Sequence, residues 1–169
     1  MTIKRIILSF IILISSLSVI AGGIGTWKSY LSYANIQWVE QGGNRLYVLA
    51  SNALYTYNKA DQSIQTYDKQ NGLSSIDIRF IGWNEVAKRL VIVYEDNNID
   101  LMDAKGNVTN VPDYYLKALT ADKTVYSIDM NGAYCYLSTG FGLVKLNVAK
   151  AEISDSYNLS FPVNYSYIE

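Results

Sequence analysis

Short runs of alternating apolar and polar residues make up most of the chain from residue 36 onward. In one of them, Leu54, Thr56 and Asn58 alternate with Tyr55 and Tyr57. A period of two in short runs rich in Val, Ile, Leu and Tyr is typical of half-buried β-strands. Residues that favour tight hairpins separate the runs, so the pattern predicts an all-β fold. These turns are Gly42-Gly43-Asn44, Lys59-Ala60-Asp61, Asn71-Gly72, Asp96-Asn97, Lys105-Gly106-Asn107 and Asn131-Gly132.

The runs repeat along the chain. Equivalent segments begin at Arg45, Arg89 and Ala133, which are 44 residues apart. One four-stranded β-propeller blade needs about 40–50 residues, so the repeat predicts three blades over 36–68, 78–111 and 125–157. The predicted strands are 36–39, 46–50, 54–58 and 63–68, then 78–83, 90–94, 99–103 and 108–111, then 125–129, 134–138, 143–147 and 152–157. Residues 161–169 are predicted to start a fourth blade.

Propellers close with about four to eight blades. Three blades therefore predict an incomplete propeller. Either the chain is the front part of a longer protein, which we expect, or it closes by assembling with copies of itself. An open arc exposes one sheet face at each end, and we expect both of these faces to be apolar.

The first 21 residues have the features of an export signal. Lys4 and Arg5 precede an apolar stretch, 6–20, which ends at the small residues Ala21 and Gly22. This order is typical of a secretory signal peptide with cleavage after Ala21. The alternative is an uncleaved membrane anchor, but the stretch is shorter than the ~20 residues that span a bilayer and contains several serines. The sequence predicts a mature chain, 22–169, with no stable transmembrane span, located in the periplasm or at the outer-membrane-associated cell surface.

Expression with export in a Gram-negative host should yield a chain that starts at Gly22, because the export machinery removes the signal at the small-residue exit. Intact mass analysis of the exported fraction measures the start. An exported chain that retains Met1 would contradict cleavage.

The composition excludes several classes of function. The chain has no His and one Cys, and its formal net charge is −1. Without His, neither a Ser-His-Asp triad nor the usual zinc sites can form. Without a basic surplus, binding to nucleic acid is not expected. Cys135 lies in the predicted strand 134–138 and is expected to be buried and inert. We predict no catalytic residue, no metal site and no cofactor.

Two sets of acidic residues are candidate sites. Asp96-Asn97-Asn98-Ile99-Asp100 has the D-x-N-x-D opening of a calcium loop, but positions six and twelve of that loop hold Leu101 and Asn107 instead of Gly and Glu. A polar hairpin turn is the favoured interpretation. Asp77, Asp100 and Asp129 lie on or beside strands of the second and third predicted blades. They could meet as catalytic carboxylates, although nothing in their spacing requires it.

The aromatic residues offer a third possibility. Trp27, Trp38 and Trp83 accompany 15 Tyr residues. Aromatic rings can bind sugars by stacking, which would give a glycan-binding surface. The favoured interpretation is structural, with Trp and Tyr filling the space between blades.

Several segments resemble a known family. Asn71-Gly-Leu-Ser-Ser75 is similar to the repeats of two-component regulator propellers. The segments 25–33, 89–103 and 138–144 resemble the N-terminal propeller of the PorZ family, which belongs to the type IX secretion system of Bacteroidota. The resemblance covers 25–158.

This resemblance implies a protein with two seven-bladed propellers and a C-terminal β-sandwich sorting domain. It also implies a non-enzymatic scaffold that acts with PorU, PorV and PorQ and supplies anionic lipopolysaccharide for cell-surface attachment of secreted cargo. Two alternatives remain open. One is the periplasmic sensor propeller of a hybrid two-component regulator, and the other is a propeller hydrolase or lyase.

Overall fold

The computed structural model describes residues 31–164. The predicted signal peptide (1–21), its cleavage site between Ala21 and Gly22, and Trp27 lie outside this range. Residues 165–169 of the predicted fourth blade lie outside it as well. These expectations stay predictions.

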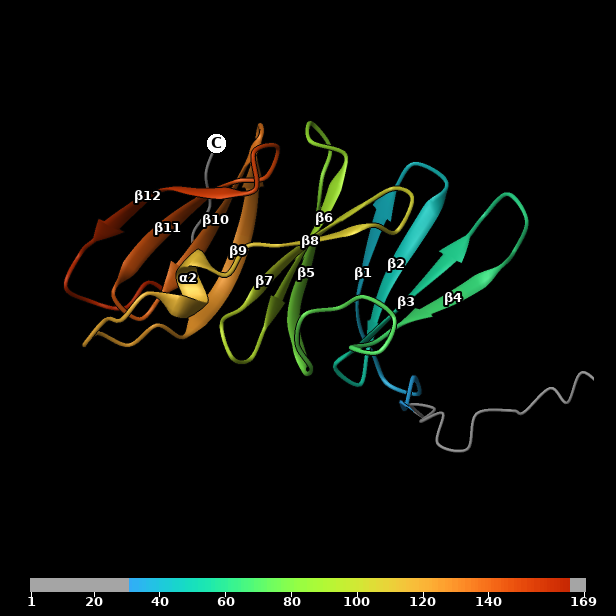
Figure 1. The fold of residues 1–169 in the computed structure, drawn as a ribbon, viewed down its shortest axis with the longest axis horizontal. Helices are drawn as coiled ribbons and strands as arrows, with labels where there is room; N and C mark the ends of the chain where they lie inside the picture. Colours follow the sequence, from blue (N-terminus) through green and yellow to red (C-terminus); the bar gives the residue numbers. More distant parts are fainter. Residues whose placement is uncertain (1–30, 165–169) are drawn as a thin grey trace, which may run out of the picture.

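Within residues 31–164 the chain forms three four-stranded antiparallel sheets (Figure 1). In each sheet the strands follow their order in the sequence, which is the meander of a propeller blade. Blade one contains β1 (Ile36–Gly42), β2 (Arg45–Ala50), β3 (Ala53–Asn58) and β4 (Ile64–Tyr67). Blade two contains β5 (Ile78–Asn84), β6 (Arg89–Tyr94), β7 (Ile99–Asp103) and β8 (Val108–Asn110). Blade three contains β9 (Val125–Asn131), β10 (Tyr134–Thr139), β11 (Gly142–Asn147) and β12 (Glu152–Asn158).

These sheets confirm the predicted all-β fold of propeller blades. The largest difference in strand bounds is in β1, which continues to Gly42 because Glu40, Gln41 and Gly42 stay paired with β2 up to the turn. A short helix that was not expected from the sequence, α2 (Asp113–Leu116), lies between blades two and three. Its single turn is too short to produce a helical period in the sequence.

The first strand of each blade lies next to the first strand of the following blade. β1 contacts β5, and β5 contacts β9, so these three are the inner strands of the arc (Figure 1). Each inner strand has an irregular register at the same place, where Gln37, Arg79 and Tyr126 are extra residues. The irregularity lets an inner strand follow the curve of the arc.

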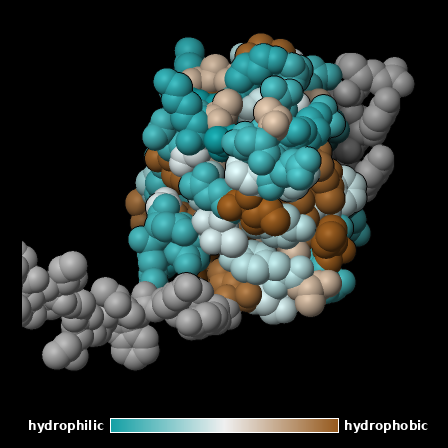
Figure 2. Space-filling model, turned by 90° about the vertical axis from the view of Figure 1, so that its right-hand side faces the viewer, coloured by the Kyte–Doolittle hydropathy of each residue, from teal (hydrophilic) through white to brown (hydrophobic). Residues whose placement is uncertain are grey.

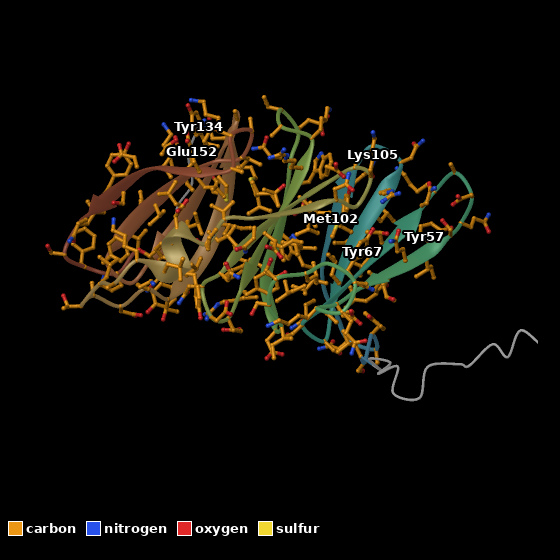
Figure 3. The ribbon with its side chains drawn as sticks, in the orientation of Figure 1. Tyr57, Tyr67, Met102, Lys105, Tyr134 and Glu152 are labelled. Atoms are coloured by element: carbon orange, nitrogen blue, oxygen red, sulfur yellow. The ribbon has the colours of Figure 1, made fainter. Side chains whose placement is uncertain are left out.

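Apolar side chains between neighbouring blades form the core. Tyr47, Tyr67 and Leu54 of blade one pack with Trp83 and Met102 of blade two, and Figure 3 shows Tyr67 and Met102 between these blades. A second cluster joins blades two and three and contains the fully buried Cys135. Burial raises the pKa of the Cys135 thiol, which disfavours the reactive thiolate. The prediction that Cys135 is buried is confirmed.

Asn84 fastens blade two to blade three. Its fully buried side chain donates from Nδ2 to the carbonyl oxygens of Gly132 (3.0 Å) and Tyr134 (3.3 Å). Its Oδ1 accepts a hydrogen bond from the Ala87 amide at 2.8 Å. A buried amide with all of these partners satisfies polar groups of both blades at once.

The two end faces of the arc differ in character. On blade one the outer face is apolar: Val39 and Val48 lie opposite each other, Val48 pairs with Tyr55, and Ile64 is 66% exposed. Figure 2 views this side of the molecule and shows brown, hydrophobic patches among teal ones.

The expectation of a second apolar face is wrong for blade three. Asp129, Tyr136, Lys145 and Asp155 follow one another across its four strands in direct register. Directly opposed residues share a face of a sheet. Lys145 Nζ lies 4.0 Å from the centroid of the Tyr134 ring. The apolar residues of blade three lie on the face that packs against blade two. The charged residues lie on the other face of the same sheet, which we had expected to be apolar.

No helix among residues 31–164 is long and apolar enough to cross a bilayer.

Candidate functional site: the inner groove

Asp100 is a structural carboxylate in the interior of blade two. It is 0% exposed and accepts hydrogen bonds from Tyr94 Oη (2.7 Å) and from the Ser74 amide (2.8 Å) through Oδ2. Its Oδ1 accepts from Asn110 Nδ2 at 2.8 Å. Burial, followed by the neighbouring Asp100 charge, raises the pKa of Tyr94, so this phenol stays a donor. Asp100 joins a loop and two strands and has no open side for a substrate.

Asp77 and Asp129 occupy other settings. Asp77 is exposed just before β5, at a φ of +55°, and its carbonyl accepts the Glu95 amide at 3.0 Å. Asp129 lies on the inner strand β9. The three candidate carboxylates therefore do not line one cavity. In the range 31–164 no group of three or more His, Cys, Asp or Glu residues could hold a metal ion.

The D-x-N-x-D segment is a hairpin turn between β6 and β7. Asp96 accepts the Asn98 amide at 2.9 Å and the Ser75 hydroxyl at 2.5 Å. Asn97 has a φ of +66°, and the Tyr94 amide donates to the Asn98 carbonyl at 3.1 Å. Asp96 thus accepts hydrogen bonds from the protein itself, and the segment is the polar hairpin turn that the sequence predicted.

A cavity with a volume of about 610 Å³ lies along the three inner strands. We call it the inner groove. Its lining residues are Gln37, Trp38, Glu40, Leu49, Arg79, Phe80, Ile81, Gly82, Trp83, Ser127, Ile128, Asp129 and Met130. A cavity of this size is typical of small-ligand sites. The groove brings together Trp38, Trp83 and Asp129, which the sequence analysis had singled out for different reasons.

Trp83 is a packing residue. Its ring stacks on Tyr47 with centroids 5.3 Å apart and an interplanar angle of 18°, and only 9% of the residue is exposed. A Cβ on Gly42 would lie 2.6 Å from the Trp83 ring, so this position needs glycine for the close approach. For Trp83 the structural interpretation is confirmed.

Trp38 differs from Trp83 although its local chemistry is the same. Trp38 Nε1 donates to Glu40 Oε1 at 2.7 Å, and Trp83 Nε1 donates to Glu85 Oε2 at 2.7 Å. Yet Trp38 is 58% exposed. The interpretation that tryptophans fill the space between blades therefore does not describe Trp38.

Among the residues described as lining the groove, acidic side chains outnumber basic ones. Glu40 and Asp129 contribute carboxylates. Arg79 is the only basic residue among the lining residues described, and its Nη1 is paired with Glu95 Oε2 at 2.9 Å. The sequence analysis missed Glu40 and Arg79. The signal that could have found Glu40 is its i, i+2 spacing from Trp38, which places both on one face of a strand.

Repeated four-stranded meanders with adjacent inner strands define the class of this protein, a partial β-propeller. The family model described as the N-terminal β-propeller domain of PorZ, of the type IX secretion system, matches residues 46–169. The chain belongs to this family, which consists of interaction modules and is not a known class of enzymes.

Solved structures agree with this assignment. PorZ of Porphyromonas gingivalis, described as an essential bacterial surface component of the type-IX secretion system, is 33% identical to the chain with a TM-score of 0.73. The match covers 79% of this chain and 18% of PorZ, so the chain spans about a fifth of the length of that relative.

Two other structures share the fold. One is the extracellular domain assigned to a one-component system of B. thetaiotaomicron, at 14% identity and a TM-score of 0.59, covering 81% of this chain and 18% of that one. The other is AztD from Citrobacter koseri, at 16% identity and a TM-score of 0.57, covering 78% and 35%. No curated protein sequence matches the chain.

Proposed function

We propose that this chain is part of a non-enzymatic scaffold of the type IX secretion system, which acts at the cell surface in the attachment of secreted cargo through anionic lipopolysaccharide. Its partners in this role are PorU, PorV and PorQ. Membership of the PorZ propeller family carries the proposal. The sensor extracellular domains, at 14–16% identity, share the fold alone and favour no second function.

The residue geometry supports a binding role. Asp100, the most buried candidate acid, already accepts hydrogen bonds from three protein donors. Asp129 and Asp77 line different cavities. General acid–base catalysis needs positioned groups that share one substrate, and this pair does not provide them.

Deletion of the complete gene should leave cargo proteins synthesised but unattached, without their lipopolysaccharide modification, because the scaffold that joins cargo and glycan is lost. Immunoblots of surface and medium fractions measure both changes, and the wild-type gene should restore them. Normal attachment in the deletion strain, with altered transcription of a carbohydrate-use locus, would instead indicate a sensor.

A complemented strain carrying Asp77→Asn and Asp129→Asn together tests the absence of catalysis. Attachment should stay nearly normal, because amides keep the shape and can still accept hydrogen bonds. Asp100→Asn is unsuitable here, because its new amide would oppose donors from Tyr94, Ser74 and Asn110 and impair folding. Severe loss of attachment in the well-folded double variant would favour an enzyme.

A further inference from the structure

Trp38 is fixed in place without being buried. The bond from Nε1 to Glu40 Oε1 satisfies its polar atom, so the ring has no unmet hydrogen bond. Glu40 Oε2 is also 3.4 Å from the Trp83 amide, which anchors the carboxylate to blade two. The indole is therefore oriented by both blades, while more than half of the residue stays exposed at the inner groove.

The equivalent positions in the other blades show that this exposure is particular to blade one. The residue after the irregular register is Trp38 in β1, Phe80 in β5 and Ser127 in β9, opposite Leu49, Val93 and Ser138. Phe80 packs against the core between blades two and three. A large apolar ring left in water forgoes about 25 cal/mol for each Å² that burial would remove. Trp38 thus offers an oriented, exposed apolar surface against which a ligand can pack.

The chemistry around the ring suggests what that ligand is. A pyranose has a C–H face that packs on an aromatic ring and hydroxyl groups that donate to acceptors. The inner groove supplies such an acceptor in the carboxylate of Glu40, and its concave volume of about 610 Å³ suits a short oligosaccharide. A flat apolar surface without acceptors would instead fit an apolar side chain of a protein partner.

The charged residues that line the inner groove indicate whether the bound sugar is neutral or anionic. Carboxylates line the groove, whereas its guanidinium, Arg79, is paired with Glu95. A phosphate or carboxylate on the sugar would face the like charge of Glu40, and among the lining residues described there is no unpaired cation to offset it. Neutral sugars avoid this repulsion.

We propose that the inner groove is a saccharide-binding site that takes neutral pyranose residues, with Trp38 as the stacking platform. The site deepens the proposed function, on which it rests, because it assigns this propeller the uncharged sugar units of a glycan. Charged groups of the same glycan would be held elsewhere.

The test measures binding by the purified full-length protein with calorimetry, using maltopentaose and mannopentaose as neutral probes and mannose 6-phosphate against mannose as the charged pair. At least one neutral pentasaccharide should bind with a Kd below about 10 mM. Trp38→Ala should weaken it about tenfold and Trp38→Phe by less, because a smaller ring keeps part of the stacking surface. Mannose should bind better than mannose 6-phosphate.

Ile64→Ala is the matched control, because Ile64 is an exposed apolar residue on β4 (66%) that does not line the groove. It should leave binding unchanged. Equal binding by Trp38→Ala and the wild type, absence of binding by both pentasaccharides, or preference for mannose 6-phosphate would each overturn the proposal. A cargo-attachment defect in Trp38→Ala without any saccharide binding would also overturn it and assign the ring to a protein partner.

The proposed function can fail separately. Normal cargo attachment in the deletion strain would refute the secretion role even if the groove binds sugars. Attachment lost on deletion, with no sugar bound, would refute the saccharide site alone.

Discussion

Replacing Gly142 by Ala should destabilise the protein by about 3–5 kcal/mol, among the largest effects expected of one methyl group. Gly142 begins β11 at a φ of +147°, a conformation that residues with a Cβ rarely adopt. A Cβ there would overlap the carbonyl oxygen of Tyr157 on the paired strand β12. Because the atoms that this Cβ would meet, in Tyr157 and Leu159, all belong to the backbone, the methyl group can be accommodated only if β11 and β12 separate.

Urea unfolding of the full-length protein, followed by circular dichroism, measures the change in free energy of unfolding. Gly132→Ala is the control in the same blade, because Gly132 has a φ of +57° but nothing within 4 Å of a new Cβ. It should cost only about 1 kcal/mol. Equal losses in the two variants would show that the overlap with Tyr157 is not the cause.

Replacing Asn84 should uncouple blade two from blade three. Asn84→Ala leaves the carbonyl groups of Gly132 and Tyr134 without this donor and the Ala87 amide without its acceptor. We expect a loss of about 2–4 kcal/mol in the free energy of unfolding, because three hydrogen bonds of a fully buried side chain are lost and each contributes about 0.5–1.5 kcal/mol.

Asn84→Asp distinguishes the loss of the Nδ2 donor from a change in side-chain shape. The new carboxylate has nearly the same shape but would face two carbonyl oxygens, so the loss at neutral pH should reach about 3–5 kcal/mol. The loss should shrink as the pH falls, because a protonated carboxyl can again donate one hydrogen bond. Asn44→Ala, in an exposed turn, should stay within about 0.5 kcal/mol of the wild type at any pH. A milder effect of Asn84→Asp than of Asn84→Ala at neutral pH would contradict this account.

The fold was predictable because each blade is built from local signals. Alternation and turn residues depend only on neighbours within one blade, and the spacing between Arg45 and Arg89 gives the length of one repeat. Strands β2, β3, β6 and β7 therefore lie close to the predicted ranges. Helix α2 was missed, because a single turn between blades produces no period.

The candidate site was only partly predictable. Asp77, Asp100 and Asp129 were equivalent in the sequence as acids near strands, and the structure separates them into a turn, a buried network and the inner groove. Their settings depend on which face of which blade packs against a neighbour. A single sequence carries no signal for that choice.

The sequence by itself determined the four-stranded repeat, the turns and the buried Cys135, because each follows from the alternation of side chains along one strand. Only the tertiary structure decided that Trp83 is buried and that Trp38 is exposed. Both have a carboxylate two residues later and the same 2.7 Å hydrogen bond. The Trp83 ring is buried because it packs on Tyr47 and Gly42 of the preceding blade, whereas Trp38 stays 58% exposed at the inner groove. Packing between blades, which no local pattern encodes, separates a core residue from a candidate binding platform.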